Sequence, residues 1–318
     1  MSLTHRAPAV RDRVVAGVGV GLLGDPLVLD LLAGGPVSRE RVATLWRDTA
    51  ALTALATAKR APLEPALAAA MLDQHRRLAA SPASLANLER LARGEAVAAV
   101  AGQQPAPLGG PLYALHKTAG TVGLAADVTR RTGVPCVPLY WMHGEDSDFA
   151  EIRGVSVADA ALQLLDLQLP DTVQREGGLV GSIPLESVRE LGAAALAAWA
   201  GLPGHADVTS LWQDALSRAH DLGEAVIALW LALFAEQGLV VVDPRLPAFR
   251  AAARPILERY LANADALHAA ARSAGARMEA LTGKHALNNA SLESFVFRIE
   301  GGRSEEHTSE LQSPCNLV

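Results

Sequence analysis

The pattern of apolar and polar positions predicts a helical first part of the chain and a mixed second part. The segments that read as helices are 27–32, 38–58, 63–78, 84–93, 185–200, 208–236 and 248–281. Short apolar runs bounded by turn formers stand at 95–101, 134–142 and 239–242, and such runs are typical of buried parallel strands. Because a helix pattern separates the first two runs, the order predicts an α/β fold with a strand–helix–strand unit.

Prolines and mixed patterns refine this picture. Pro135 can start the second strand, but Pro138 has no N–H to donate to a ladder, so we expect the strand proper to begin after Pro138. Residues 156–164 have a mixed pattern and predict a small sheet. Residues 294–299 alternate like a strand.

We expect the chain to have three parts. Residues 1–93 form a helical N-terminal segment, and residues 94–302 form an α/β core with a helical insertion at about 156–236. Residues 303–318 (RSEEHTSELQSPCNLV) have no periodicity and look like a translated sequencing-adapter read-through. We therefore exclude this tail from the fold and expect Cys315 to be non-native.

Two amides follow the first predicted strand. Gly102 ends the strand, and Gln103 and Gln104 come next. Ligands of open α/β sheets bind outside the carboxyl ends of the strands, and an amide offers donors and an acceptor without charge. These glutamines suit a nucleotide base, a sugar or a carboxylate. The alternative is a solvated turn, because loops often carry polar residues.

The next helix has a glycine-rich entrance. Gly110 and Pro111 stand where a helix begins, and such an end attracts anions through its N–H groups and dipole. Gly110, Tyr113 and Lys117 share one helix face by their spacing, so Lys117 can reach back towards a phosphate or carboxylate. The alternative is an exposed lysine beside a half-buried tyrosine. No P-loop motif occurs here.

Charged residues cluster after the second and third strands. His143, Glu145, Asp146 and Asp148 follow the second strand, where carboxylates could hold Mg²⁺, bind an amino group or act as a base. The alternative is an acidic surface loop that caps the next helix. Asp243 follows the third strand and is a further candidate, whose alternative is the N-cap of the following helix.

Four motifs together resemble one family, the cysteine-adding enzymes of bacillithiol biosynthesis. The motifs are AGQQ at 101–104, GPLYALHK at 110–117, YWMHGEDSDFAEI at 140–152 and LALFAEQGLVVVDPR at 231–245. The resemblance covers residues 27 to about 303. It implies a Rossmann-like, nucleotidyltransferase-type parallel sheet with inserted helical segments. The family continues into the rest of this core and a C-terminal coiled coil, so we expect this chain to be a fragment.

The resemblance implies a ligase that adds L-cysteine to glucosaminyl-malate in the last step of bacillithiol synthesis. ATP or ADP is the implied nucleotide, Mg²⁺ is a possible companion, and full-length members are expected to form homodimers through the coiled coil. By position, the residues implied to line the nucleotide pocket are Gly102, Gln103, Gln104, Gly110, Pro111 and Tyr113. In our hypothesis Lys117 clamps an anion, while Glu145, Asp146 and Asp148 orient an amine or a metal.

The chain departs from the family pattern at three places. The family's histidine in EDHD is Ser147 here, a later asparagine–histidine is replaced by Arg153 and Gly154, and the threonine of TGQQ is Ala101. If a family histidine handles protons, this chain must be slower or rely on His143.

Composition narrows the function classes. The chain has 318 residues, half of them apolar, and a formal charge of −6 without a basic stripe, which argues against a nucleic-acid partner. Two cysteines fit a reducing cytosol, and no apolar run has transmembrane length, so we expect a cytoplasmic protein. Two alternatives to the ligase stay open. One is a nucleotidyltransferase-like enzyme with another small acceptor. The other is a non-catalytic helical interaction protein, which would be expected to lose Lys117 or the acidic loop.

Overall fold

The computed structural model describes residues 48–173 and 178–282, parts of residues 29–44, and residues 299–300 and 303–304. Its contacts divide the chain into two units, residues 1–55 with 265–293 and residues 56–264 with 294–318. Among the described residues, the first unit contains the helix α3 (Pro36–Arg41), most of α4 (Thr49–Ala58) and most of α13 (Ala264–Thr282). Parts of the predicted helices at 27–32 and 38–58 lie outside the described residues.

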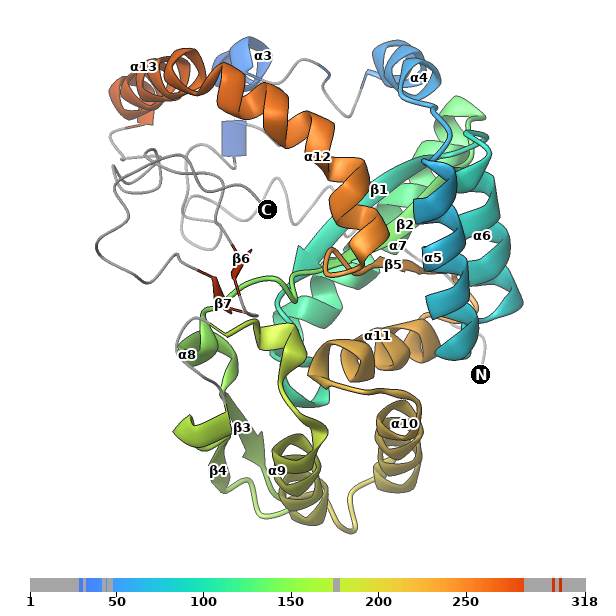
Figure 1. Cartoon of the computed structure of the whole chain (residues 1–318), viewed down its shortest axis with the longest axis vertical. Coiled ribbons are helices and arrows are strands. Elements are labelled where there is room, and N and C mark those ends of the chain that lie inside the picture. The colour runs from blue at the N-terminus through green and yellow to red at the C-terminus, as the bar shows by residue number, and fades with distance from the viewer. Residues whose placement is uncertain are drawn as a thin grey trace. The chain divides into compact units, whose positions relative to one another are not determined.

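The second unit is built on a parallel sheet of three strands. These are β1 (Val97–Gln103), β2 (Cys136–Met142) and β5 (Val240–Val242), in the order β1-β2-β5 (Figure 1). The helix α7 (Leu112–Thr132) joins β1 to β2 and ends at Gly133, whose φ of 70° is left-handed. The predicted α/β fold with parallel strands is therefore confirmed.

Helices cover the two faces of this sheet. On one face α7 packs on β1 and β2, and α11 (Leu222–Leu233) packs on β5. On the other face α5 (Pro65–Arg77) and α6 (Pro82–Ala92) contribute Met71 and Leu88 to a cluster that also contains Val137 and Val242. Both helices begin with proline and a capped first turn, because Glu64 and Ser81 accept from the backbone N–H three residues later.

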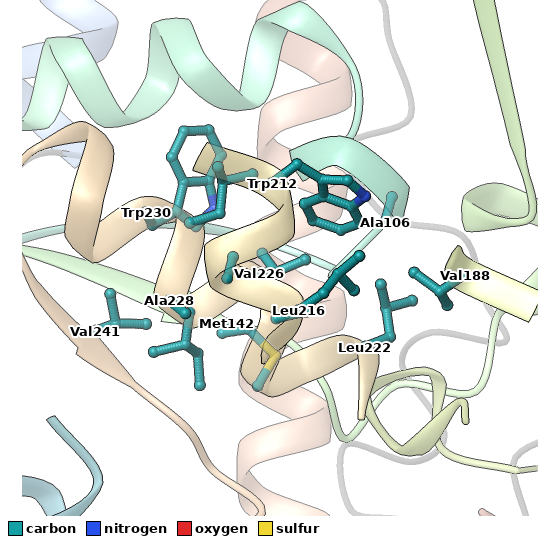
Figure 2. Close-up of a cluster of buried hydrophobic side chains, with 14 of the residues drawn as sticks. Ala106, Met142, Val188, Trp212, Leu216, Leu222, Val226, Ala228, Trp230 and Val241 are labelled. Carbon is teal, nitrogen blue, oxygen red and sulfur yellow. The ribbon is translucent and has the colours of Figure 1, made fainter. Parts of the chain in front are cut away.

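The segment between β2 and β5 forms a largely helical insertion. It contains the short helix α8 (Phe149–Ile152), the antiparallel pair β3 (Gly154–Ala158) and β4 (Leu164–Gln168), then α9 (Leu185–Ala198), α10 (His205–Arg218) and α11. The small sheet predicted near 156–164 is confirmed. Figure 2 shows Trp212 of α10 and Trp230 of α11 in the apolar core with Met142 and Val241 of the sheet.

The remaining described elements complete the unit. The helix α12 (Pro247–Ala262) follows β5 and packs on α5. The short strands β6 (Ile299–Glu300) and β7 (Arg303–Ser304) pair antiparallel, so strand pairing reaches into the tail that the sequence pattern excluded. Residues 294–298 and 305–318 lie outside the described part. None of the described helices is both long and apolar enough to span a membrane.

The strand β2 starts earlier than expected. Pro138 lies inside the strand, opposite Ala99 of β1. The N–H of His143 donates to the carbonyl of Gln103, so odd-numbered residues of β2 direct their N–H groups to β1. The position of Pro138 faces the other side, where pairing with β5 begins only at Leu139. The missing N–H therefore removes no ladder hydrogen bond, and the prediction that the strand begins after Pro138 was wrong.

A buried histidine of α5, His75, forms a hydrogen bond with the strand β5. His75 is fully buried, its Nδ1 lies 2.8 Å from the carbonyl oxygen of Met71, and the backbone N–H of Val241 donates to its Nε2 at 3.2 Å. Because Nε2 accepts, Nδ1 carries the proton and the ring is neutral. Burial lowers the pKa of His75 from 6.5 to about 4, against the raising effect of the Met71 carbonyl.

We expect His75 to make folding sensitive to mild acid. The unfolded chain takes up this proton near pH 6.5 and the folded chain only near pH 4, so stability present above pH 6.5 is lost as the pH falls towards 4. The loss corresponds to about 3 kcal/mol. Urea unfolding between pH 7 and pH 4 measures it. His75→Gln should remove this part of the pH dependence, and an identical pH dependence in the variant would contradict the assignment.

Candidate functional site

The segments that follow β1, β2 and β5 meet at the carboxyl edge of the sheet. Gln103 pairs with Met142, and Trp141 pairs with Val242, so the three strands end at nearly the same level. Ligands of open parallel sheets bind outside this edge. The topology thus brings Gln103 and Gln104, the loop from His143 to Asp148, and Asp243 to one edge.

The close approach of β1 and β2 at this edge requires glycine at position 102. A Cβ on Gly102 would lie 2.4 Å from the carbonyl oxygen of Trp141 and 3.1 Å from Cδ2 of His143. Such a contact with backbone forces the strands apart. Gly102 therefore sets the spacing between the two strand ends.

A chain of side-chain hydrogen bonds crosses the edge from α7 to the acidic loop. Lys117 Nζ donates to Gln103 Oε1 at 3.0 Å, and Gln103 Nε2 donates to Gln104 Oε1 at 2.8 Å. Gln104 is buried, and its Nε2 donates to Asp146 Oδ2 at 2.8 Å and to Glu151 Oε2 at 2.9 Å. The amide of Gln104 thus orients two carboxylates.

Glu151 was not among the predicted site residues, although it belongs to the same acidic run in the sequence. Its backbone N–H donates to Oδ1 of Asp148, which is the N-cap of α8. Asp146 Oδ1 accepts from the backbone N–H of Ser147 and of Asp148, at 2.6 and 3.0 Å. The alternative of an acidic loop that caps the next helix is therefore correct for Asp148. Asp146 instead organises the turn and faces Gln104.

His143 and Glu145 form a second pair in this loop. Trp141 Nε1 donates to Glu145 Oε1 at 3.2 Å, and His143 Nδ1 lies 3.9 Å from the same oxygen. Within the described residues, Glu145 Oε2 is buried without a hydrogen-bond partner. Burial raises the pKa of Glu145 and lowers the pKa of His143. For His143, the charge of Asp146 acts in the opposite direction and that of Lys117 in the same direction.

Glu145→Gln is expected to stabilise the fold at neutral and alkaline pH. A carboxyl group whose pKa is raised by folding favours the folded state below its unfolded pKa, and this advantage is lost as the pH rises through the folded pKa. The amide does not titrate, so the variant should unfold at a higher temperature than the wild type at pH 8 and show no such gain at pH 4. A gain of the same size at both values, measured by thermal unfolding, would refute the argument.

The entrance to α7 is open and glycine-rich. The helix begins at Leu112, and Pro111 occupies the N-cap position, one residue earlier than the first helical turn that we expected for it, without a capping side chain. Gly109 and Gly110 have φ values of 86° and 82°, which glycine adopts without strain. Lys117 Nζ lies 5.0 Å from the centre of the Tyr113 ring, which confirms that these two residues share one face.

Asp243 is buried at the end of β5 and belongs to an ion pair. It accepts from Arg245 Nε at 3.0 Å, from Arg245 Nη2 at 2.9 Å and from Gln74 Nε2 at 3.2 Å. The N-cap of α12 is Leu246, so the alternative reading of Asp243 as that cap was wrong. A direct contact of Asp243 with a cofactor stays a prediction.

Arg245 is a residue that the sequence interpretation missed, although it closes the motif LVVVDPR. Its side chain is 10% exposed and also donates to Asp221, the N-cap of α11, from Nη1 at 2.8 Å. Burial lowers its pKa, but the hydrogen bonds and charges of Asp243 and Asp221 outweigh burial and raise it.

Two of the positions that depart from the family pattern have defined surroundings in the structure. Ser147 is 4% exposed. Arg153 forms an ion pair with Asp171 at 2.5 Å, and its guanidinium lies 5.7 Å from the centre of the Phe149 ring. The described residues contain no group of three or more His, Cys, Asp or Glu side chains arranged to hold a metal ion.

Comparison with known proteins decides the family. A family model described as "Bacillithiol biosynthesis BshC, N-terminal Rossmann-like domain" matches residues 42–310. The chain belongs to the BshC family. The resemblance seen in the four motifs and the Rossmann-like fold class are therefore confirmed.

Curated relatives carry the name "Putative cysteine ligase BshC". The protein of Geobacillus thermodenitrificans is 34% identical over 59% of this chain and 34% of its own length. That of Koribacter versatilis is 33% identical over 67% of this chain and 39% of its own length, and that of Salinibacter ruber is 29% identical over 81% and 47%. The chain thus spans about a third to a half of the length of these relatives.

Proposed function

We propose that this chain is the part of an ATP-dependent ligase that binds the nucleotide and an amine, and that the ligase joins L-cysteine to glucosaminyl-malate. Membership of the BshC family and the ligase names of its relatives support this proposal. The hydrogen-bonded chain from Lys117 through both glutamines to Asp146 and Glu151 carries it, because it places a cation and two carboxylates at one sheet edge.

The entrance of α7 fits the phosphates of a nucleotide. The first turn of a long helix presents N–H groups and the positive end of the dipole, and no side chain caps this end. Gly109 and Gly110 let the chain turn into this helix end, because both have φ values that other residues rarely adopt. Lys117, four residues beyond Tyr113 on the same face, adds a positive charge.

The acidic loop fits an ammonium group. Asp146 and Glu151 are held by the same amide nitrogen, and the second oxygen of Asp146 accepts from the backbone of the loop. The second oxygen of Glu151 and the half-exposed His143 then offer acceptors to a cationic amine beside the charge of Asp146. L-cysteine and the glucosamine part of the acceptor both carry such an amine. We assign this loop to the amine that forms the new amide bond.

Each group then has a chemical task. ATP, when bound, activates a carboxylate that otherwise would not acylate an amine in water. Lys117 and the helix entrance hold the negative charge in register. His143, whose lowered pKa keeps its imidazole neutral at pH 7, takes the proton from the ammonium group, with Nδ1 facing Glu145 and Nε2 as the accepting atom.

The thiols of the source bacterium test this function. With the gene disrupted, mass spectrometry should find no bacillithiol and an accumulation of glucosaminyl-malate. Complementation with the Lys117→Ala gene should fail to restore the thiol, whereas the wild-type gene restores it. Unchanged bacillithiol would overturn the proposal and favour a nucleotidyltransferase-like enzyme with another acceptor.

A further inference from the structure

A buried guanidinium lies under the acidic loop and contacts three separate segments of the chain. Arg245 makes two hydrogen bonds to Asp243 from Nε and Nη2, and two to Asp221 from Nη1 and Nη2. Its Nη1 also lies 3.4 Å from Ser182 Oγ. These partners come from the end of β5, from the N-cap of α11 and from the segment before α9.

Glycines of three segments meet this guanidinium. A Cβ on Gly223, in the first turn of α11, would lie 2.5 Å from Arg245 Nη2. A Cβ on Gly181 would lie 2.9 Å from Nη1, and one on Gly144 would lie 3.0 Å from Nε. Real Cβ atoms essentially never lie closer than 3.0 Å to another side chain, so Gly223 and Gly181 fit against Arg245 because they lack a Cβ. Gly144 has a tight fit, because its Cβ would also lie 2.7 Å from the sulfur of Met142.

The same segments hold the acidic loop by its backbone. The N–H of Gly181 donates to the carbonyl of Gly144 at 3.0 Å, and the N–H of Val180 donates to the carbonyl of Asp146 at 2.8 Å. Arg245 itself touches neither His143 nor Asp146 among the contacts described. Arg245 therefore influences the positions of His143 and Asp146 only indirectly, through the backbone at Gly144 and Gly181.

We infer that Arg245 is a positioning residue, which sets the acidic loop and the helical insertion in register at the carboxyl edge of the sheet. The role for amine binding rests on the proposed function. The mechanical part does not, because it follows from the contacts of Arg245 with Asp221, Asp243 and the three glycines.

The test introduces one methyl group whose nearest neighbours are Nη2 of Arg245 at 2.5 Å and the carbonyl oxygen of Gly181 at 3.0 Å, and Arg245→Lys separates the two contacts because it leaves Gly181 unchanged. Gly223→Ala displaces the guanidinium, whereas Gly120→Ala in α7 meets nothing within 4 Å and is the matched control. The histidine signals in NMR spectra of this chain, with His143 assigned by His143→Gln, report the loop. In Gly223→Ala we expect the pKa of His143 to rise towards 6.5, because a displaced loop is less buried.

Two further measurements complete the test. Arg245→Lys, which keeps the charge but not the planar fork, should shift the same titration, and the double variant with Gly223→Ala should show less than the sum of both effects. If the ligase function holds, Gly223→Ala also raises KM for the substrate that supplies the amine of the new amide bond by about tenfold, and Gly120→Ala does not.

The outcomes separate the two proposals. A titration of His143 that is unchanged in a folded Gly223→Ala protein would overturn the positioning role. If Gly223→Ala does not fold, Arg245→Lys takes its place, and an unchanged titration there has the same meaning. A shifted titration in a protein that ligates no cysteine would support the positioning role and refute the proposed function.

Discussion

Lys117→Ala is expected to reduce the rate of the proposed cysteine ligation by about two to three orders of magnitude, because in that proposal Lys117 supplies the positive charge that faces the activated group. This expectation rests on the position of Lys117 in the first turns of α7, where its Nζ donates to Gln103 Oε1 at 3.0 Å. Steady-state ligation of L-cysteine to glucosaminyl-malate measures the rate, and calorimetry with ATP measures the loss of nucleotide affinity.

Neighbouring variants make this result specific. His116→Ala removes an exposed side chain one position earlier on the same helix and should leave the rate unchanged. Lys117→Arg keeps the charge but presents a planar fork, so we expect partial activity. Near-normal turnover of Lys117→Ala with unchanged nucleotide affinity would refute the anion clamp. Normal turnover with weak nucleotide binding would restrict Lys117 to ground-state binding.

Asp243→Ala should lower the free energy of unfolding by about 3–5 kcal/mol, because it leaves the guanidinium of Arg245 buried without its main partner. Asp243 is 3% exposed and accepts two hydrogen bonds from the Arg245 side chain and one from Gln74. Asp221 remains as the second partner of Arg245, with a side chain that is 24% exposed. Chemical denaturation followed by circular dichroism measures the change.

An exposed ion pair provides the comparison. Asp214 and Arg218 are four residues apart on α10, and their side chains are 57% and 39% exposed. Water screens such a pair, so Asp214→Ala should leave the unfolding midpoint almost unchanged. If Asp243→Ala changed the free energy of unfolding as little as Asp214→Ala, the pairing of Asp243 with Arg245 would not stabilise the sheet edge.

The local sequence determined most of the framework. Apolar runs at 95–101, 134–142 and 239–242 produce β1, β2 and β5, because a strand buried on both faces needs a nearly continuous apolar segment. The GPLY motif places the start of α7, and AGQQ places two amides at the end of β1. Together these motifs were also sufficient to predict the family, which the comparison confirmed.

Tertiary structure decided what each polar group does. Gln104 appeared as a ligand-binding amide in the sequence, yet its hydrogen bonds go to Asp146 and Glu151, 42 and 47 positions away. Asp243 appeared as a site residue or a helix cap, yet it pairs with Arg245 and with Gln74, 169 positions away. Pro138 was predicted to lie before its strand. It lies inside the strand, and its missing N–H removes no hydrogen bond because pairing with β5 begins only at Leu139.

The sequence by itself determined where the strands and helices form and which residues reach the carboxyl edge, because periodicity and turn formers act between near neighbours. Only the tertiary structure decided that His75 accepts a hydrogen bond from Val241 and that Arg245 lies against three glycine-containing segments. Hydrogen bonds between distant segments depend on the strand order and on which polar side chains it brings together, and neither leaves a periodic signal in the chain.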